Sequence, residues 1–188
     1  MAILKSLRRR FLLTALLLAL TGLPVGFAQQ ATPEYKLKAV FLYNFAQFVD
    51  WPTNSFADNN SPLIIGVLGK DPFGQTLDET VADEAVKNRK LVVRRFKQPS
   101  EVTDCHVLFV SSSHAGDAAA LAAKLKDRAV LTVGDAPDFI ENGGLVRFFT
   151  EKNKLRFAIN LEAAKADKLA ISSKLLQLAE IVSPAKRP

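Results

Sequence analysis

Residues 63–68 read Leu63-Ile64-Ile65-Gly66-Val67-Leu68, and this stretch decides the fold because it is wholly apolar and lies between polar segments. Similar short apolar or β-branched runs follow at residues 91–96, 106–110 and 130–133. Runs of this length without polar alternation are typical of strands that are buried on both faces of a sheet. The sequence therefore predicts a central sheet whose strands are covered on both sides.

Helical segments separate most of these runs. Asp71-Pro72 opens one helix that extends to about Ala82, and residues 117–127 form a second that is rich in alanine and leucine. Strands and helices in alternation imply right-handed crossovers, which place consecutive strands parallel to one another. We therefore expect a largely parallel sheet with helices on both faces.

The pattern changes toward the C-terminus. Residues 144–150 and 155–160 resemble strands and are joined by the polar residues 151–154, which predicts a hairpin. We expect this antiparallel pair to finish one edge of the sheet, and helical patterns at 161–168 and 172–182 to close the chain. The predicted fold class is α/β: a mostly parallel central sheet of about six strands, helices on both faces and a C-terminal antiparallel hairpin.

A helix precedes all of these strands. Thr32 supplies a capping hydroxyl, Pro33 suits the first helical position, and we expect the helix to continue to about Asp50. Tyr43 falls on the polar side in a projection at 100° per residue. The apolar side, which we assign to the core, carries Leu37, Val40, Phe41, Phe45 and Phe48.

The start of the chain has the features of a cleavable secretory signal. A basic segment with four Lys and Arg residues precedes the apolar residues 11–20, and Gly26-Phe27-Ala28 offers the small residues that signal peptidase accepts. The apolar run is far shorter than the ~20 residues that a helix needs to cross a bilayer. We expect residues 1–28 to be removed on export and residues 29–188 to form a single domain.

The charge balance argues against nucleic acid as a partner. The formal net charge is +6, but the predicted signal holds four of the 25 Lys and Arg residues and no acidic residue. The 21 basic and 19 acidic side chains that remain leave the mature chain at +2. This small surplus gives no strong electrostatic case for binding nucleic acid.

Cys105 is the only cysteine in the sequence, so no intramolecular disulfide can form. A lone cysteine in an exported protein can act as a redox handle or link two chains, which leaves a homodimer open. Because Cys105 opens the apolar run of residues 105–110, we favour a small buried thiol.

No catalytic constellation is recognisable in the sequence. His106 begins a predicted buried strand, and nothing in the sequence marks His114 with a paired acid. Neither histidine belongs to a spaced cluster of metal ligands, and the carboxylates are scattered. We therefore expect no enzyme activity, no metal site and no cofactor.

A serine-rich loop is the best candidate for a ligand site. Ser111, Ser112 and Ser113 follow the third predicted strand, at the carboxyl edge where doubly wound folds bind ligands. Hydroxyls and exposed amides at a helix N-terminus can hold an anion, and an ordinary loop with a helix cap is the competing interpretation. Residues 66–74 match neither phosphate-binding glycine motif, and we interpret them as a tight turn before a capped helix.

Seven short motifs occur in a fixed order along the mature chain. They are KAVFLYNF at 38–45 with Trp51-Pro52, IGVLGKDPFG at 65–74, CHVLF at 105–109, LTVGD at 131–135, Gly143-Gly144, LRFAINL at 155–161 and ISSKLL at 171–176. This ordered series resembles the YfiR family of exported bacterial proteins. The resemblance implies an α/β sandwich-like domain in the periplasm, in agreement with the pattern of strands and helices.

The resemblance also implies a function. In the best-known member, the protein binds the periplasmic part of an inner-membrane diguanylate cyclase and holds it inactive until an outer-membrane lipoprotein draws the repressor away. Cyclic di-GMP then rises and biofilm formation follows. We expect a non-enzymatic regulator whose partners are a diguanylate cyclase, or another membrane sensor, and an outer-membrane lipoprotein. The alternative is a periplasmic receptor for a nucleotide or aromatic metabolite that serves another membrane sensor, such as a histidine kinase.

Two motifs bear on how such a regulator would be controlled. Cys105-His106 matches the Cys-His pair of the family, but no second cysteine exists to bridge it, so control through an intramolecular disulfide is not expected here. Arg156 lies in the R-F-x-I-N motif of the family. Its planar guanidinium can pair with an anionic ligand, and a surface salt bridge is the competing interpretation.

Partner binding calls for exposed aromatic or apolar anchors, because a few such residues carry most of the affinity of an interface. We expect these anchors at Tyr43 on the first helix, at Trp51 in the Trp-Pro corner and at Phe73 in the turn after the first strand. Ordinary packing or capping is the competing interpretation for each of the three.

Overall fold

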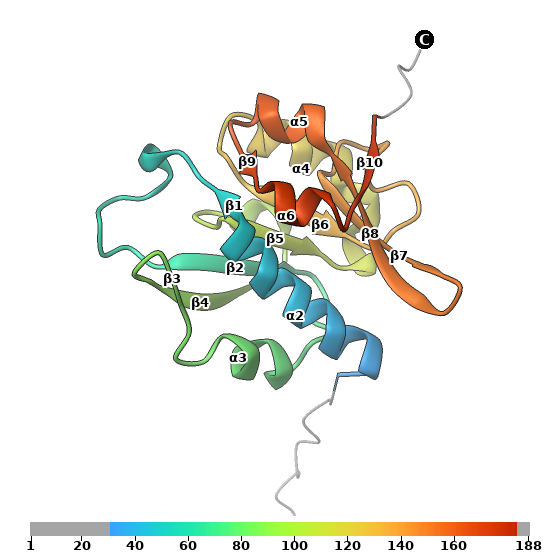
Figure 1. The fold of residues 1–188 in the computed structure, drawn as a ribbon, viewed down its shortest axis with the longest axis horizontal. Helices are drawn as coiled ribbons and strands as arrows, with labels where there is room; N and C mark the ends of the chain where they lie inside the picture. Colours follow the sequence, from blue (N-terminus) through green and yellow to red (C-terminus); the bar gives the residue numbers. More distant parts are fainter. Residues whose placement is uncertain (1–30, 184–188) are drawn as a thin grey trace, which may run out of the picture.

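In residues 31–183, which the computed structural model describes, eight strands form a sheet in the order β10-β8-β7-β6-β5-β2-β4-β3 (Figure 1). The predicted signal at residues 1–28 lies outside the described residues. The strands are β1 (Val49–Asp50), β2 (Leu63–Leu68), β3 (Ala85–Val86), β4 (Arg89–Phe96), β5 (Val107–Val110), β6 (Leu131–Gly134), β7 (Val146–Glu151), β8 (Lys154–Asn160), β9 (Ala170–Ile171) and β10 (Glu180–Val182). The helices are α2 (Pro33–Phe48), α3 (Gln75–Val81), α4 (Ala118–Leu125), α5 (Leu161–Ala166) and α6 (Ser173–Leu176).

The centre of the sheet is parallel, as predicted. Strand β2 lies between β4 and β5, and its residue Ile65 is in register with Val93 on one side and Val107 on the other. Strands β6 and β7 continue the parallel arrangement, and β7 then turns back into β8 as the predicted antiparallel hairpin. The predicted α/β class with a mostly parallel sheet is therefore confirmed.

The C-terminal edge of the sheet differs from the prediction. Strand β10 pairs in parallel with β8, so the hairpin does not finish the sheet. The predicted helix over residues 172–182 is also wrong, because α6 ends at Leu176 and the chain becomes extended at Glu180. The outer edge of β8 offers unpaired backbone groups, and pairing with them satisfies the backbone of β10.

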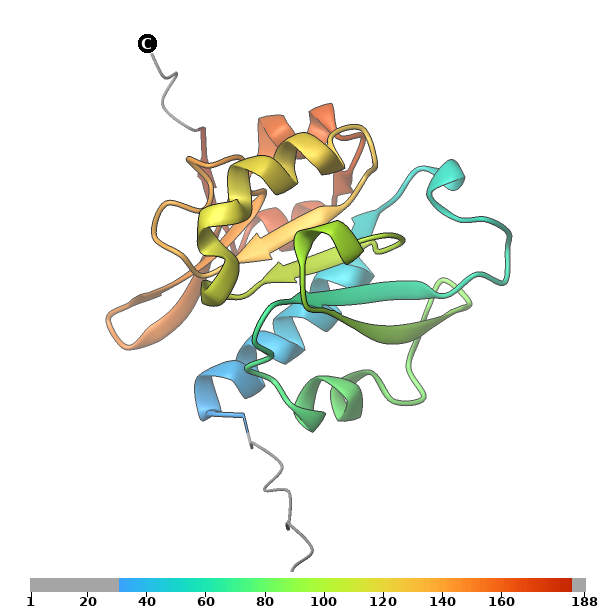
Figure 2. The same cartoon turned by 180° about the vertical axis from the view of Figure 1, so that it is seen from behind.

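The sheet separates two hydrophobic cores. Side chains alternate along β2, so that Leu63, Ile65 and Val67 pack on the face that carries α2 and α3, while Ile64 and Leu68 pack on the face that carries α4. Figure 1 looks onto the α2 face and Figure 2 onto the α4 face. The expected helices on both faces are therefore present.

Helix α2 begins as the sequence predicts. The Thr32 hydroxyl accepts a hydrogen bond from the Tyr35 amide at 3.5 Å, and Pro33 occupies the first helical position. The helix ends at Phe48, where the chain enters β1 and pairs antiparallel with β9. This small two-stranded pair connects the end of α2 to the segment before α6.

Only part of the predicted apolar side of α2 faces the core. Phe45 is fully buried, and Phe41 and Phe48 are partly buried against the α2-side core, but Leu37 and Val40 are 45% and 43% exposed. The projection ranks residues by hydrophobicity alone, whereas the face of α2 that meets the sheet includes the charged Lys38, which pairs with the partly buried Asp135. That face consists of Lys38, Ala39, Leu42, Phe45 and Ala46.

We expect Phe45→Ala to lower the free energy of unfolding by about 3–5 kcal/mol, because the ring leaves a cavity when it is removed. The Phe45 ring packs on Phe148 and Phe157, with centroid distances of 5.8 Å and 5.2 Å. Chemical denaturation measures the change. The control is Val40→Ala on the exposed side of the same helix, which should change stability by less than about 0.5 kcal/mol. Equal losses in the two variants would contradict the observed orientation of α2.

Candidate functional site

The carboxyl ends of β2, β5 and β6 meet at one edge of the sheet, where each strand is followed by polar residues. A shallow cavity of about 230 Å³ lies at this edge, and Tyr35 of α2 also contributes to its wall. The parallel topology therefore brings the predicted serine loop next to the N-terminal part of α2. The residues that line the cavity are Tyr35, Lys70, Asp71, Pro72, Ser111, Ser112 and Ser113.

Two of the three serines hold the loop itself. The Ser111 hydroxyl oxygen accepts from the Ser113 amide at 3.4 Å, and the Ser113 hydroxyl oxygen accepts from the Lys70 amide at 3.0 Å. Ser111 thereby caps the 3₁₀ turn Ser112–Asp117, which matches the capping interpretation. Ser112 is exposed at the cavity. A ligand role for these serines stays a prediction.

A glycine is required where the serine loop approaches β2. Gly69 has φ +89°, and a Cβ atom on it would lie 2.4 Å from the Ser113 hydroxyl oxygen and 2.5 Å from the His114 ring. Any side chain at this position would be strained and would also displace the loop. The tight turn expected over residues 66–74 is therefore part of the same edge.

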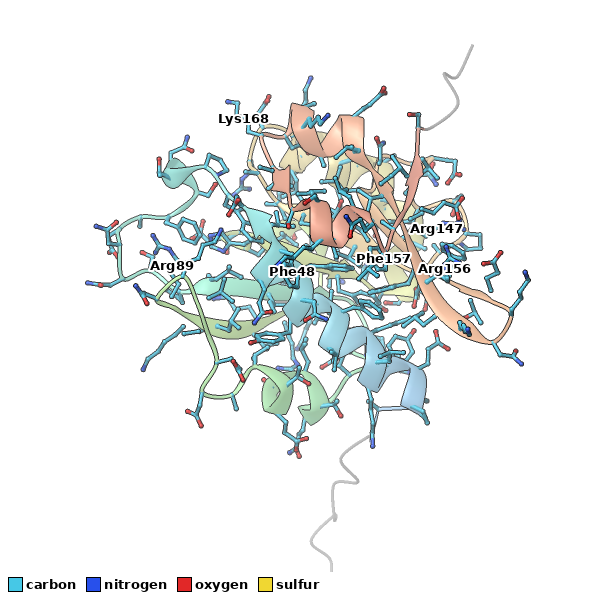
Figure 3. All side chains as sticks on the ribbon, viewed as in Figure 1. Phe48, Arg89, Arg147, Arg156, Phe157 and Lys168 are labelled. Carbon is cyan, nitrogen blue, oxygen red and sulfur yellow. The ribbon has the colours of Figure 1, made fainter. Side chains whose placement is uncertain are left out.

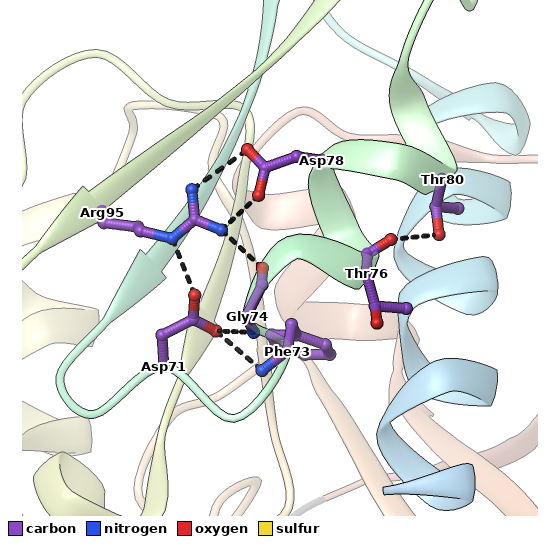
Figure 4. A network of polar contacts seen from close by, with 7 residues as sticks. All are labelled: Asp71, Phe73, Gly74, Thr76, Asp78, Thr80 and Arg95. Atoms are coloured by element: carbon purple, nitrogen blue, oxygen red, sulfur yellow. Dashed lines mark hydrogen bonds and ion pairs between the residues drawn. The ribbon is translucent and has the colours of Figure 1, made fainter. Parts of the chain in front are cut away.

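An arginine clamp fixes the turn after β2 (Figure 4). Arg95 on β4 donates from Nε to Asp71 at 2.7 Å and from its terminal nitrogens to Asp78 and to the Gly74 carbonyl. The other oxygen of Asp71 accepts from the Phe73 and Gly74 amides, so α3 starts at Gln75, later than predicted. The Asp71 carboxylate lines the cavity, but both of its oxygens already accept hydrogen bonds from Arg95 and from the turn.

A buried ion pair lies behind this edge, and sequence reasoning missed it. Lys38 is 2% exposed, and its ammonium nitrogen is 2.7 Å from Asp135 after β6 and 2.7 Å from Glu34. The Tyr35 hydroxyl donates to the same Asp135 oxygen at 2.8 Å. Burial, together with this hydrogen bond, raises the pKa of Tyr35, so the phenol remains a donor. A buried charge is costly unless it is paired, and this cluster supplies the pairing.

His106 is a structural residue with both ring nitrogens engaged. Its Nδ1 accepts from the Ile64 amide at 3.0 Å, so the hydrogen lies on Nε2, which donates to the Ser55 carbonyl at 3.1 Å. Burial lowers the pKa of His106, which favours this neutral form. His106 therefore has no lone pair left for general-base chemistry.

His114 does have a paired acid, which corrects the sequence analysis. Asp117, three residues along the same turn, lies 2.7 Å from Nδ1, and Nε2 is 3.0 Å from the Lys97 carbonyl oxygen. The second nitrogen thus faces a backbone carbonyl rather than a serine hydroxyl. The arrangement provides no nucleophile activated by a base.

The three predicted anchors are not fully exposed. Phe73 is completely buried against Tyr35 and Phe109, which corrects the expectation of an exposed anchor at this position. The arginine clamp fixes the turn after β2 against the core, and the Phe73 ring in that turn therefore points inward. Trp51 is half-buried, with its indole nitrogen 3.3 Å from the His106 carbonyl oxygen, and Tyr43 is half-buried and donates to Glu84 at 2.7 Å.

Arg156 lies on the β7–β8 hairpin near Arg147 (Figure 3). Its guanidinium is 3.1 Å from Glu151, and both side chains are about half exposed, at 44% and 50%. This is the surface salt bridge of the competing interpretation, a kind of contact that contributes little to stability. Arg156 does not line the cavity at the carboxyl edge.

Exposed apolar side chains concentrate on one side of the molecule. Leu37 and Val40 lie on α2, and Ile181 is in register with Ile159 of the α2-side core. Leu178 lies in the segment that leads from α6, whose Leu175 belongs to the same core, to β10. We call these four residues the apolar face. Val92, the other large exposed apolar side chain in residues 31–183, is in register with Ile64 and lies on the α4 side.

Two further kinds of site are absent from residues 31–183. That part of the chain holds no group of three or more His, Cys, Asp and Glu side chains placed to bind a metal ion. It also contains no helix with the length and apolar character needed to cross a bilayer.

Comparisons with known proteins agree with this fold. The model of a family described as YfiR/HmsC-like matches residues 35–180. No curated protein matches the sequence. A conserved domain protein from Vibrio cholerae has a similar structure, with a TM-score of 0.53 and 13% identity over 81% of this chain and 60% of that one. An ABC domain in complex with L-Trp from Streptococcus pneumonia is similar with a TM-score of 0.49 and 11% identity over 77% of this chain and 60% of that one.

The chain spans about three fifths of the length of these two solved structures. At such low sequence identity, the likeness to the Vibrio cholerae protein shows a shared α/β fold and nothing further about activity.

We expect Lys38→Met to lower the free energy of unfolding by about 3–5 kcal/mol, because it leaves Asp135 partly buried without its cation. Adding Asp135→Asn should restore part of the loss, since the uncompensated charge is then removed. Lys36→Met, an exposed substitution two residues away, is the control. Chemical denaturation of all four chains decides: an undisturbed Lys38→Met variant would show that the ion pair does not hold α2.

We expect Cys105 to react slowly with thiol reagents at pH 8 in the folded chain and quickly after unfolding. Cys105 is buried, and burial raises its pKa from 9.0 to about 12. Because the unfolded thiol loses its proton first, stability should fall as pH rises above about 9. Cys105→Ala should lessen that fall. Fast labelling of the folded chain, or identical pH profiles for the two chains, would contradict the buried thiol.

Proposed function

Because the chain belongs to the YfiR/HmsC-like family, we propose that it is a periplasmic regulator that binds an inner-membrane diguanylate cyclase and holds it inactive. In this proposal the chain controls cyclic di-GMP, and through it biofilm formation. Residues 1–28 direct export and are removed, and residues 29–188 act as one domain. The family match over residues 35–180 supports the regulatory role.

The apolar face is the observation that carries the proposal. Leu37, Val40, Leu178 and Ile181 are each at least 43% exposed, on α2, on β10 and on the segment that leads into β10. Contiguous exposed apolar patches mark interaction surfaces on soluble domains, whereas single residues are ordinary, and we propose that these four residues act as one patch. The proposed occupant is the periplasmic part of the cyclase, and Tyr43 and Trp51 extend the candidate surface as half-buried aromatic residues.

Repression of this kind requires binding and no chemistry. A regulator that prefers the inactive form of its partner shifts the population toward that form, and a shift from 1:99 to 99:1 takes about 5.5 kcal/mol of preference. An outer-membrane lipoprotein that competes for the same apolar face would release the cyclase. The proposed regulator is accordingly non-enzymatic.

A second candidate function is a periplasmic receptor for a nucleotide or aromatic metabolite, coupled to another membrane sensor such as a histidine kinase. The cavity at the carboxyl edge supports it, because Ser112 and the exposed Lys70 offer a hydroxyl and a cation to an anionic ligand. Its volume of about 230 Å³ is below the common range for ligand pockets, roughly 300–1,000 Å³. We therefore rank it second.

We expect deletion of the gene to raise cyclic di-GMP and surface attachment in the host, and the rise should vanish when the partner cyclase is deleted as well. Val40→Glu should reproduce the deletion while keeping the melting temperature of the purified chain, because it places a charge in the apolar face. Val92→Glu introduces the same charge on the opposite side of the sheet and should behave like the native chain. Unchanged cyclic di-GMP in the clean deletion would rule out the repressor and favour the receptor.

A further inference from the structure

A larger cavity lies at the opposite edge of the sheet, where the parallel strands begin. Its volume is about 490 Å³, within the range of metabolite-binding pockets. Its floor consists of buried residues at the amino ends of β2, β5 and β6. They are Ile64, Cys105, His106, Ala129 and Val130. Residues 52–62, which we call the strap, form one wall.

The strap is held in place from both sides. Arg89 donates to the Asp58 and Ser61 carbonyls at 2.8 Å and 2.7 Å, and its guanidinium lies 3.7 Å from the centre of the Phe56 ring. Phe56 in turn stacks on His106, with a centroid distance of 4.4 Å and an angle of 16°. The wall is therefore built before any ligand arrives, which lowers the entropic cost of binding.

The rim of the cavity carries more positive than negative charge. Arg94, Arg128 and Lys168 line it together with Asp104 and Asp127. Figure 3 labels Lys168 and also Arg89, the anchor of the strap. Arg128 is oriented by a hydrogen bond to the Thr103 carbonyl at 3.3 Å.

The charges that act on the floor of the cavity are also mostly positive. Burial is the main cause of the raised pKa of Cys105, but Arg128, Arg94 and Lys124 oppose the rise, and Asp104 alone among the nearby charges adds to it. A ligand placed on this floor therefore meets a surplus of cations. An anionic group is favoured there over a cationic one.

The chemistry of the floor supports binding rather than catalysis. Both His106 nitrogens are engaged by Ile64 and Ser55, and the high pKa of Cys105 keeps its thiol protonated. Neither group is an activated nucleophile or a free base. The cavity thus combines an apolar floor, a fixed wall and a basic rim, which are the parts of a recognition site.

We propose that this cavity binds a small organic anion with an apolar body. The apolar floor takes the body of the ligand, and Arg94, Arg128 and Lys168 at the rim take its carboxylate, sulfonate or phosphate. The proposal goes beyond repression of a cyclase and does not rest on it, because the cavity is built from residues outside the apolar face.

Anilinonaphthalene sulfonate, an aromatic anion, is the probe, and phenylnaphthylamine, which has the same rings without the sulfonate, is its uncharged counterpart. Amide resonances of the isotope-labelled mature chain report where each probe binds. We expect the anion to shift the amides of residues 54–57, 104–106 and 128–130, and the uncharged probe to bind at least about tenfold more weakly.

Three variants sharpen the test. Arg94→Gln combined with Arg128→Gln should weaken binding of the anionic probe about tenfold or more. Ala57→Trp should prevent both probes from binding, because the indole fills the cavity. Lys36→Gln removes a charge from the exposed side of α2 and should leave binding unchanged. Melting temperatures establish that each variant is folded. Shifts confined to α2 and β10, equal binding of both probes, or an undisturbed double-arginine variant would overturn the proposal, whatever the outcome for cyclic di-GMP.

Discussion

The pairing of a buried lysine with an aspartate fixes the orientation of helix α2, and the two faces of that helix follow from it. Lys38 is the first buried residue of α2, and its ammonium group pairs with Asp135, just after the end of β6. Rotating the helix to bury its apolar stripe would withdraw the cation and leave Asp135 unpaired, a costly change for a group that is only 14% exposed. Leu37 and Val40 are therefore turned to solvent. The α2 part of the apolar face is exposed because a charge, rather than a leucine, is buried beneath the helix.

The sequence alone predicts the central strands well and the edges poorly. Strands β2, β4, β5, β6, β7 and β8 agree with the predicted runs to within two residues. Strands β2, β5 and β6 are buried along their whole length, which requires continuous apolar segments. The sequence predicts that β4 is buried on both faces, but this strand carries exposed residues, as do β7 and β8. The two-residue strands β1, β3 and β9 are too short to show any periodicity. The sequence around β10 has a helical pattern of apolar residues, so the sequence does not predict this strand. It is extended because it pairs with β8.

For the candidate sites, too, the sequence predicts local features better than long-range contacts. The position of Ser111, Ser112 and Ser113 at the carboxyl edge follows from the order of strands and helices. The His114–Asp117 contact can be inferred from the local sequence, because the two residues are three positions apart. The partner of Lys38 is 97 residues away, so no local pattern indicates it. The inward turn of Phe73 likewise depends on Arg95, which comes from another strand.

The two ends of the sheet have different properties. Doubly wound folds usually bind ligands at the carboxyl edge, but here α2, the serine loop and the arginine clamp fill much of that edge and leave a cavity of about 230 Å³. The amino edge keeps about 490 Å³ under the strap. The strap follows β1, and Lys168 at the rim precedes β9, with which β1 pairs.

Within residues 31–183 the sheet ends in β3 and β10, which are two and three residues long. These two strands themselves offer little backbone for strand addition by another chain. Recognition through the side chains of the apolar face needs no strand addition, so a single substitution there can redirect the choice of partner without altering the sheet.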